Sequence, residues 1–116
     1  MKERKASQTA EGTAAVRARE SLRPPEERIC YDPFARYFLS PKYLLFGIIK
    51  PLGDFIRWRN EKILPGMFGG VVARTRYIDD YLKDCLNDGL EQLVILGAGF
   101  DSRAYRFESL RNIKVF

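Results

Sequence analysis

Two glycines near the carboxyl end of the sequence lie where a ligand could contact the backbone. They follow a short apolar run in Leu93-Val94-Ile95-Leu96-Gly97-Ala98-Gly99, and the β-branched residues of that run predict a buried strand over Gln92–Leu96. Glycine tolerates the left-handed backbone of a tight turn and has no side chain to block a ligand. The N–H groups of the helical segment that follows are free to meet a polar or anionic ligand. The spacing Gly-x-Gly therefore predicts a ligand-binding turn, and a purely structural turn is the alternative.

The residues after the glycines separate two classes of ligand. A dinucleotide-binding turn has a third glycine, in the order G-x-G-x-x-G, where this sequence has Ser102. A bound pyrophosphate would also lie close to the carboxylate of Asp101, and two negative charges repel each other. S-adenosylmethionine has no phosphate and carries a sulfonium and an ammonium, so a nearby carboxylate is tolerated. The turn favours S-adenosylmethionine, and an NAD-linked Rossmann domain is the alternative.

Arg74 is a further candidate for ligand binding because of its place on a predicted helix. Val71 to Leu86 predicts a helix that ends at Gly89, and a helical wheel at ~100° per residue divides it into two sides. The apolar side holds Val71, Ile78, Tyr81, Leu82 and Cys85. Arg74 falls among these residues. An inward guanidinium needs an anion, which is either a carboxylate of the same protein or the carboxylate of a ligand.

The opposite side of this helix predicts a solvated surface. It holds Arg76, Asp79, Asp80, Lys83 and Asn87. Two of its pairs, Arg76–Asp80 and Asp79–Lys83, are spaced four residues apart, as in exposed helical ion pairs.

The elements expected along the chain are helical first and α/β afterwards. We expect a disordered tail over residues 1–12, followed by helices over 13–22 and 34–39, with Asp32 as the cap of the second helix. An apolar stretch over 43–49 follows, and Pro51 kinks or restarts the chain after it. The helix over 71–86 then leads to strands over 92–96 and 113–116, with a short helical segment over 101–106 between them. Strand, turn, helix and strand in succession predict a parallel pair. A parallel sheet needs several strands with both faces covered.

The fold class predicted is α/β, with a helical cap region at 13–90 followed by the first β-α-β of a cofactor-binding sheet at 91–116. We expect the chain to be the N-terminal part of such a domain, truncated after the second strand.

Composition and charge argue against several other kinds of site. The net charge is +5, but basic and acidic residues alternate, as in Arg57-Trp58-Arg59-Asn60-Glu61-Lys62, so we expect no nucleic-acid partner. With Cys30 and Cys85 as the two cysteines and no histidine, a Cys/His zinc site and a His-based catalytic dyad are excluded. The uncharged run Ile63 to Ala73 is shorter than the ~18 residues that span a bilayer. We expect a reduced, cytoplasmic protein without metal or membrane partner.

Three segments resemble one known family. The run Leu96-Gly97-Ala98-Gly99-Phe100-Asp101-Ser102-Arg103-Ala104-Tyr105-Arg106 closely resembles the glycine motif of the leucine carboxyl methyltransferase family. Residues 13–21 together with 31–35 are similar to the N-terminal pattern of its prokaryotic branch, and residues 73–79 are similar to its arginine helix. The resemblance covers nearly all of the chain from Thr13 on.

The resemblance implies a class I, Rossmann-like methyltransferase fold with S-adenosyl-L-methionine as the cofactor. It implies that Arg74 holds the cofactor carboxylate, that Gly97, Ala98 and Gly99 lie beneath the cofactor, and that Asp101 has a supporting role. A basic group near the cofactor corresponds to Arg17 or Arg19. Family members carry an acidic residue for the ribose just past the second strand, beyond Phe116.

The resemblance also implies a reaction. Its eukaryotic branch methylates the C-terminal leucine carboxylate of protein phosphatase 2A. We expect O-methylation of a carboxylate or hydroxyl on a small molecule or a protein, with no catalytic residue within this chain and an N-terminal piece that is inactive alone. The alternative outside enzymology is a non-enzymatic truncated product or a helical interaction module.

Overall fold

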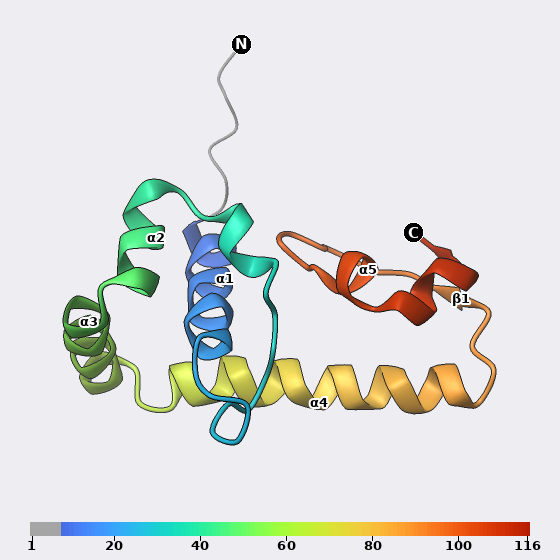
Figure 1. The fold of residues 1–116 in the computed structure, drawn as a ribbon, viewed down its shortest axis with the longest axis horizontal. Helices are drawn as coiled ribbons and strands as arrows, with labels where there is room; N and C mark the ends of the chain where they lie inside the picture. Colours follow the sequence, from blue (N-terminus) through green and yellow to red (C-terminus); the bar gives the residue numbers. More distant parts are fainter. Residues whose placement is uncertain (1–7) are drawn as a thin grey trace, which may run out of the picture.

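A computed structural model describes residues 8–116 of the chain (Figure 1). Its elements in chain order are α1 (Gln8–Ser21), the 3-10 helix η1 (Ala35–Phe38), α2 (Pro41–Ile48), α3 (Lys50–Ile63), α4 (Met67–Asn87), β1 (Gln92–Leu93), α5 (Arg103–Arg106), the 3-10 helix η2 (Glu108–Asn112) and β2 (Lys114–Val115). The order of helices followed by strand, helix and strand confirms the α/β prediction in its coarse form. Of the twelve residues expected as a tail, the last five belong to α1 and the first seven lie outside the described residues.

Proline and glycine set the ends of the helices. Pro41 and Pro51 occupy the first turns of α2 and α3, where a missing N–H costs no hydrogen bond, and the extended backbone of Ile49 separates the two helices. Gly66, at a left-handed φ of 80°, precedes α4, and Gly89, at 93°, follows it. Helix α4 therefore begins before the predicted 71–86 and includes Gly69 and Gly70 in its first turn.

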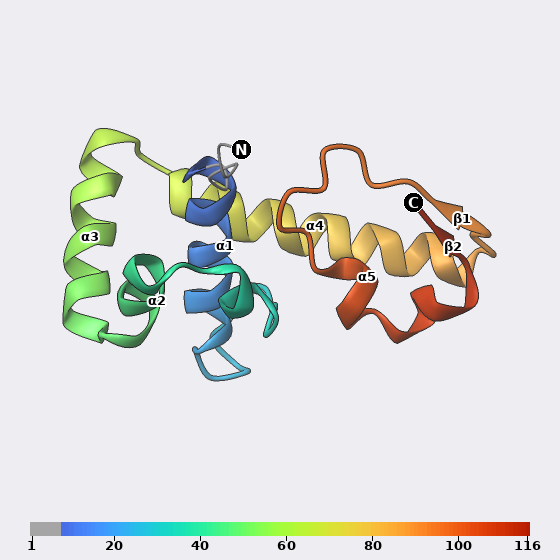
Figure 2. The same cartoon turned by 90° about the horizontal axis from the view of Figure 1, so that it is seen from above.

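The long helix α4 connects two parts of the molecule. Figures 1 and 2 show α2 and α3 near one end of it and the strands with α5 near the other, while α1 crosses it between them. Helix α1 contacts η1, α2 and α4, so it lies at the centre of the helical part. The helical cap region and the strand region are thus joined along one rigid element.

The two strands pair in parallel, as the sequence predicted. Gln92 lies opposite Lys114 and Leu93 opposite Val115. Both strands are shorter than the predicted ranges 92–96 and 113–116. The backbone pairing nevertheless continues past them, because Phe116 N–H donates to the carbonyl of Leu93 (2.9 Å) and Ile95 N–H donates to the carbonyl of Phe116 (2.8 Å). The side chains of Val94, Leu96 and Phe116 are 58%, 88% and 70% exposed. A parallel pair with exposed apolar side chains has the character of one part of a wider sheet.

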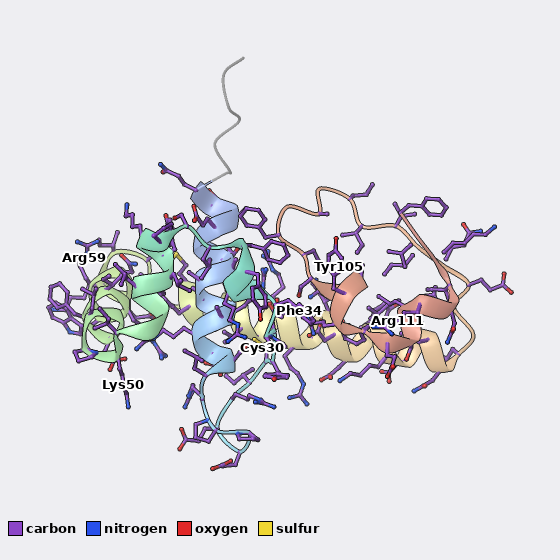
Figure 3. All side chains as sticks on the ribbon, turned by 45° about the horizontal axis from the view of Figure 1, so that its top comes forward. Cys30, Phe34, Lys50, Arg59, Tyr105 and Arg111 are labelled. Carbon is purple, nitrogen blue, oxygen red and sulfur yellow. The ribbon has the colours of Figure 1, made fainter. Side chains whose placement is uncertain are left out.

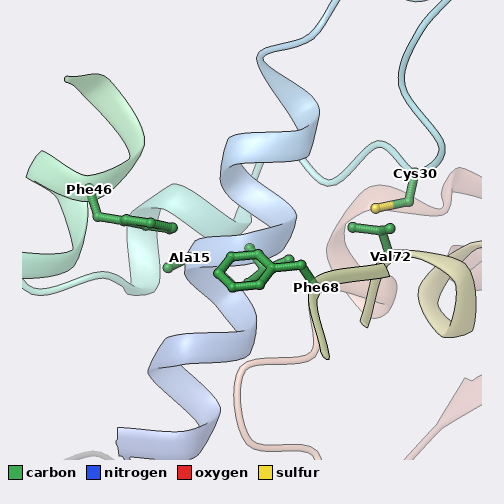
Figure 4. Close-up of a cluster of buried hydrophobic side chains, with 6 residues drawn as sticks. Ala15, Cys30, Phe46, Phe68 and Val72 are labelled. Atoms are coloured by element: carbon green, nitrogen blue, oxygen red, sulfur yellow. The ribbon is translucent and has the colours of Figure 1, made fainter. Parts of the chain in front are cut away.

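The main core lies where α1, α2 and α4 meet. Its buried members are Ala15, Val16, Cys30, Phe46, Phe68 and Val72 (Figure 4). Small side chains allow α1 and η1 to approach closely, since Ala14 of α1 and Ala35 of η1 are fully buried. Within residues 8–116, no helix combines the length and the apolar character needed to cross a membrane.

The core thiol of Cys30 has unusual acid–base properties. Its side chain is 3% exposed and lies between α1 and α4 (Figures 3 and 4). Burial, together with the carboxylates of Glu20, Asp79 and Asp32, raises the pKa of this thiol from 9.0 to about 11, against the lowering effect of Arg106. At neutral pH the thiol is therefore protonated and has little nucleophilic character.

We predict that Cys30 is alkylated by iodoacetamide at pH 8 at least about tenfold more slowly than Cys85, because only the thiolate reacts and access to Cys30 is closed. Peptide mass spectrometry over a time course measures both rates. In urea the two rates should converge. Equal rates in the native protein would contradict the burial of Cys30.

Candidate functional site

The turn after β1 has the backbone that the sequence predicted. Gly97 and Gly99 have φ values of 59° and 52°, in the left-handed region, and the turn is closed by Asp101 N–H donating to Ala98 C=O at 2.8 Å. All three residues of the turn are exposed, and a Cβ placed on Gly97 would meet nothing within 4 Å. Within the described part of the chain, no backbone hydrogen bond is donated by Gly97, Ala98 or Gly99. The turn therefore offers a ligand its free N–H groups at the end of a parallel strand.

Asp101, the residue expected to support the cofactor, is directed toward the protein. Its Oδ1 accepts a hydrogen bond of 2.8 Å from the backbone N–H of Arg103, and its Oδ2 pairs with the guanidinium of the same residue. The first of these bonds satisfies a free N–H at the start of α5. The role of Asp101 is thus to fix the segment that leaves the turn.

Asp79 on α4 is the centre of this part of the structure. Its carboxylate is 7% exposed and accepts from Arg103 Nε at 2.8 Å and from both terminal nitrogens of Arg106, each at 2.8 Å. These arginines lie 24 and 27 residues further along the chain. Two-nitrogen contact of a guanidinium with a carboxylate is strong and directional. Asp79 therefore holds α5 against α4.

The predicted surface location of Asp79 was wrong. The buried side of α4 is formed by Phe68, Val72, Thr75, Asp79 and Leu82. No pair with Lys83 is formed by Asp79; Lys83 contacts Asp80 instead, at 3.6 Å. The prediction failed because the wheel counted apolar residues alone, whereas the buried side includes a carboxylate neutralised by distant arginines. The exposed pair Arg76–Asp80 was predicted correctly, at 2.6 Å, and its hydrogen bond lowers the pKa of Asp80.

A second buried carboxylate joins α1 to the same assembly. Asp32 is 1% exposed; its Oδ1 accepts from Ala35 N–H at 3.1 Å, and its Oδ2 accepts from Arg17 Nε at 3.0 Å. The helix predicted from Phe34 is the 3-10 helix η1, whose cap position is Phe34, so Asp32 holds the turn before this helix and is not its cap. Arg106 Nε lies 3.9 Å from Asp32 Oδ1. Another nitrogen of Arg17 donates to the carbonyl of Phe100 at 2.6 Å, directly after the glycine turn.

These side chains form one charge-balanced group, which we call the ion-pair network; its carboxylates Asp32 and Asp79 are buried, and its other members are partly buried. Its members are Arg17, Asp32, Asp79, Asp101, Arg103 and Arg106. Three carboxylates face three guanidiniums, and within residues 8–116 no buried side-chain nitrogen or oxygen is without a hydrogen-bond partner. The network connects α1, the segment before η1, α4 and both sides of the glycine turn.

Arg74 occupies a different place from the one expected. It is exposed on α4, and no ion pair or side-chain hydrogen bond joins it to another described residue. Two neighbours of Arg74 on the side that the sequence assigned to the core are also exposed, Ile78 at 39% and Tyr81 at 62%, whereas Leu82 is buried. The desolvation argument for Arg74 therefore does not apply to the described chain, and its place in a cofactor site stays a prediction.

The candidate turn is a surface feature rather than the wall of a cleft. One cleft of about 510 Å³ lies between the segment around Cys30 and α5, with Arg28, Arg76 and Lys83 among its lining. Two further clefts, of about 490 and 380 Å³, lie beside α1. None of the three is lined by residues 97–101 or by Arg74. The turn, Asp101 and Arg74 therefore lie outside these three clefts.

The family model of leucine carboxyl methyltransferase matches residues 10–116. The chain belongs to the leucine carboxyl methyltransferase family. It is 36% identical over 108 residues to a Streptomyces coelicolor protein named as an S-adenosyl-L-methionine-dependent methyltransferase, covering 93% of this chain and 36% of that protein. A protein of the same name from Frankia alni is 37% identical over 108 residues, with the same coverage. The chain thus spans about a third of the length of the curated relatives it matches.

We predict that Asp79→Asn destabilises the protein by about 3 kcal/mol, because it removes the buried carboxylate that offsets most of the desolvation of the partly buried guanidiniums of Arg103 and Arg106. The midpoint of a urea-unfolding transition measures the effect. The matched control is Asp80→Asn, which removes a carboxylate from an exposed pair and should leave the midpoint nearly unchanged. Equal shifts for the two neighbours would contradict the central place of Asp79.

Proposed function

We propose that this chain supplies part of the S-adenosylmethionine site of a methyltransferase. The observation that carries the proposal is the open glycine turn, with free N–H groups at Gly97, Ala98 and Gly99 directly after a parallel strand. Ligands of open α/β sheets bind at the carboxyl ends of the strands. Membership of the leucine carboxyl methyltransferase family and the names of the relatives support this choice of cofactor.

In this proposal the turn lies beneath the cofactor and Arg74 holds the cofactor's carboxylate. A guanidinium is suited to a carboxylate because its N–H groups match two oxygens. The exposed location of Arg74 leaves that fork free for an external anion. Asp101 acts indirectly, since both of its oxygens already contact Arg103. The wider Rossmann-like sheet and a cytoplasmic location belong to the same proposal.

The proposed reaction is methyl transfer to an oxygen, with a carboxylate as the favoured acceptor and a hydroxyl as the other. The cofactor supplies an already activated methyl group on its sulfonium, and transfer leaves a neutral thioether. A carboxylate acceptor needs no general base, so positioning and exclusion of water are the main tasks of the protein. No residue of this chain is assigned to the chemical step. The acceptor is a small molecule or a protein carboxylate.

We predict that the full-length protein binds S-adenosylmethionine and that Arg74→Ala weakens this binding by about 1–3 kcal/mol, because a charged hydrogen-bond partner of the cofactor is lost. Isothermal titration calorimetry measures both affinities. Arg76→Ala is the matched control, since Arg76 is exposed on the same helix but already paired with Asp80. Unchanged affinity in Arg74→Ala would remove the role given to this residue, and binding of NAD instead of S-adenosylmethionine would overturn the proposed function.

We also predict that Gly97→Val lowers cofactor affinity at least about tenfold, since a branched side chain at this left-handed position costs about 1–3 kcal/mol and projects into the ligand's space. Gly89→Val is the control. Its φ of 93° is similarly restricted and its surroundings are equally open, but it lies at the end of α4. Comparable losses of stability are expected for both variants, so a similar loss of affinity in Gly89→Val would show that strain alone is responsible.

A further inference from the structure

We propose that the outer face of α3 is a docking surface for a bilayer that contains anionic lipids. At ~100° per residue, six exposed residues share one side of this helix, and we call them the aromatic-basic face. They are Leu52, Phe55, Trp58, Arg59, Lys62 and Ile63. This role is separate from methyl transfer and would attach the protein to a membrane surface without a spanning helix.

The apolar side chains of the aromatic-basic face are open to solvent. The opposite side of α3 packs on the core through Gly53 and Ile56. On the outer side the rings of Phe55 and Trp58 stack with their centroids 5.9 Å apart. The exposed fractions of Leu52, Phe55, Trp58 and Ile63 are 41%, 57%, 55% and 67%. An ordered group of exposed apolar side chains of this size indicates an interaction site.

This face lies at the end of the molecule away from the strands. Figures 1 and 2 show α3 near one end of α4, whereas β1 and β2 lie near the other. The wider sheet proposed above grows from β1 and β2. It therefore gives a reason for the exposed apolar side chains of the strand region, but none for those of α3.

Cations without a carboxylate partner accompany the apolar side chains. Arg59 and Lys62 belong to the face itself, and Lys62 Nζ lies 4.0 Å from the centroid of the Trp58 ring. Lys50 and Arg59 extend from α3 at this end of the molecule (Figure 3). Among residues 8–116, no ion pair includes Lys50, Arg57, Arg59 or Lys62. These cations are free to meet anions outside the chain.

The acidic residues of α3 do not cancel this charge. The helix contains four basic and two acidic residues. Asp54 is paired with Arg19, and Glu61 accepts a hydrogen bond from the backbone N–H of Gly66. Both carboxylates are thus engaged within the protein, so the outer surface of α3 is complementary to a negatively charged partner.

The form of the face favours a bilayer over a protein partner. Its apolar residues line none of the three clefts, so they protrude rather than enclose a ligand. Protruding Trp, Phe and Leu with basic neighbours are typical of helices that lie in the headgroup region, where long cationic side chains reach the phosphates. The sequence expectation of no membrane partner rested on the length of an uncharged run, which concerns spanning helices only.

Tyr37 is a matched control for Trp58. Its side chain is 69% exposed, its ring centroid lies 6.3 Å from that of Phe34, and the guanidinium of Arg36 lies 4.8 Å from its ring centroid. Both sites therefore have an exposed ring, an aromatic neighbour and a cation. They differ in place, because Tyr37 belongs to η1 and lies outside the aromatic-basic face.

The test is sedimentation of the full-length protein with phosphatidylcholine vesicles, with or without about one third phosphatidylserine. We expect binding to the anionic vesicles that weakens as salt is added, because salt screens the attraction. Trp58→Ser should bind at least about tenfold more weakly and Arg59→Gln about fivefold more weakly. Tyr37→Ser and Arg36→Gln should stay within about twofold of the wild type. All four positions are exposed, so the unfolding midpoints should change little.

Absence of wild-type binding to anionic vesicles would overturn the proposal, and so would equal losses in Trp58→Ser and Tyr37→Ser. A wild-type dimer that Trp58→Ser converts to a monomer, without vesicle binding, would identify the face as a contact between copies of the chain and would also overturn it. The sedimentation test needs no cofactor, so its outcome is independent of the proposed function.

Discussion

The contact between Asp79 and two arginines is the constraint on which the rest of the strand region depends. The strands of the described chain are short, and α5 is a single turn of helix, so neither has much stability of its own. Three charge-assisted hydrogen bonds from Arg103 and Arg106 hold this region against the long helix α4. Because Asp79 is buried and the two arginine side chains are largely desolvated, removing this carboxylate weakens the whole arrangement.

The residues of the family motif fall into two groups with different roles. In the run from Gly97 to Arg106, the glycines and Ala98 present an open backbone, whereas the aspartate and the two arginines that follow contact the protein. The polar residues of the motif thus shape the turn rather than line a pocket. Arg17 of α1 also contacts this segment, because it donates to the carbonyl of Phe100 directly after the turn. The helical part of the chain therefore supports the turn.

Much of this architecture could be predicted from the sequence. The glycine turn, the parallel pairing and the break at Pro51 follow from local rules on backbone freedom and hydrogen bonding, which depend on few neighbours. The buried side of α4 could not be predicted in the same way. Whether Asp79 faces solvent or the interior depends on residues 24 and 27 positions away, and local periodicity contains no information about them. The sequence did contain one signal for a buried carboxylate partner: Arg103 and Arg106, three residues apart after the glycine turn, lie on the same side of a helical turn.

The central claim is that the ion-pair network supports the turn and stays intact when the cofactor is present. A crystal structure of the full-length protein with S-adenosylmethionine tests it most directly. We expect the cofactor against residues 97–99, with Asp79 still in contact with Arg103 and Arg106, and Arg17 still bonded to the carbonyl of Phe100. A complex in which any of these arginines leaves its carboxylate to bind the cofactor, or in which the cofactor lies away from the turn, would contradict the account.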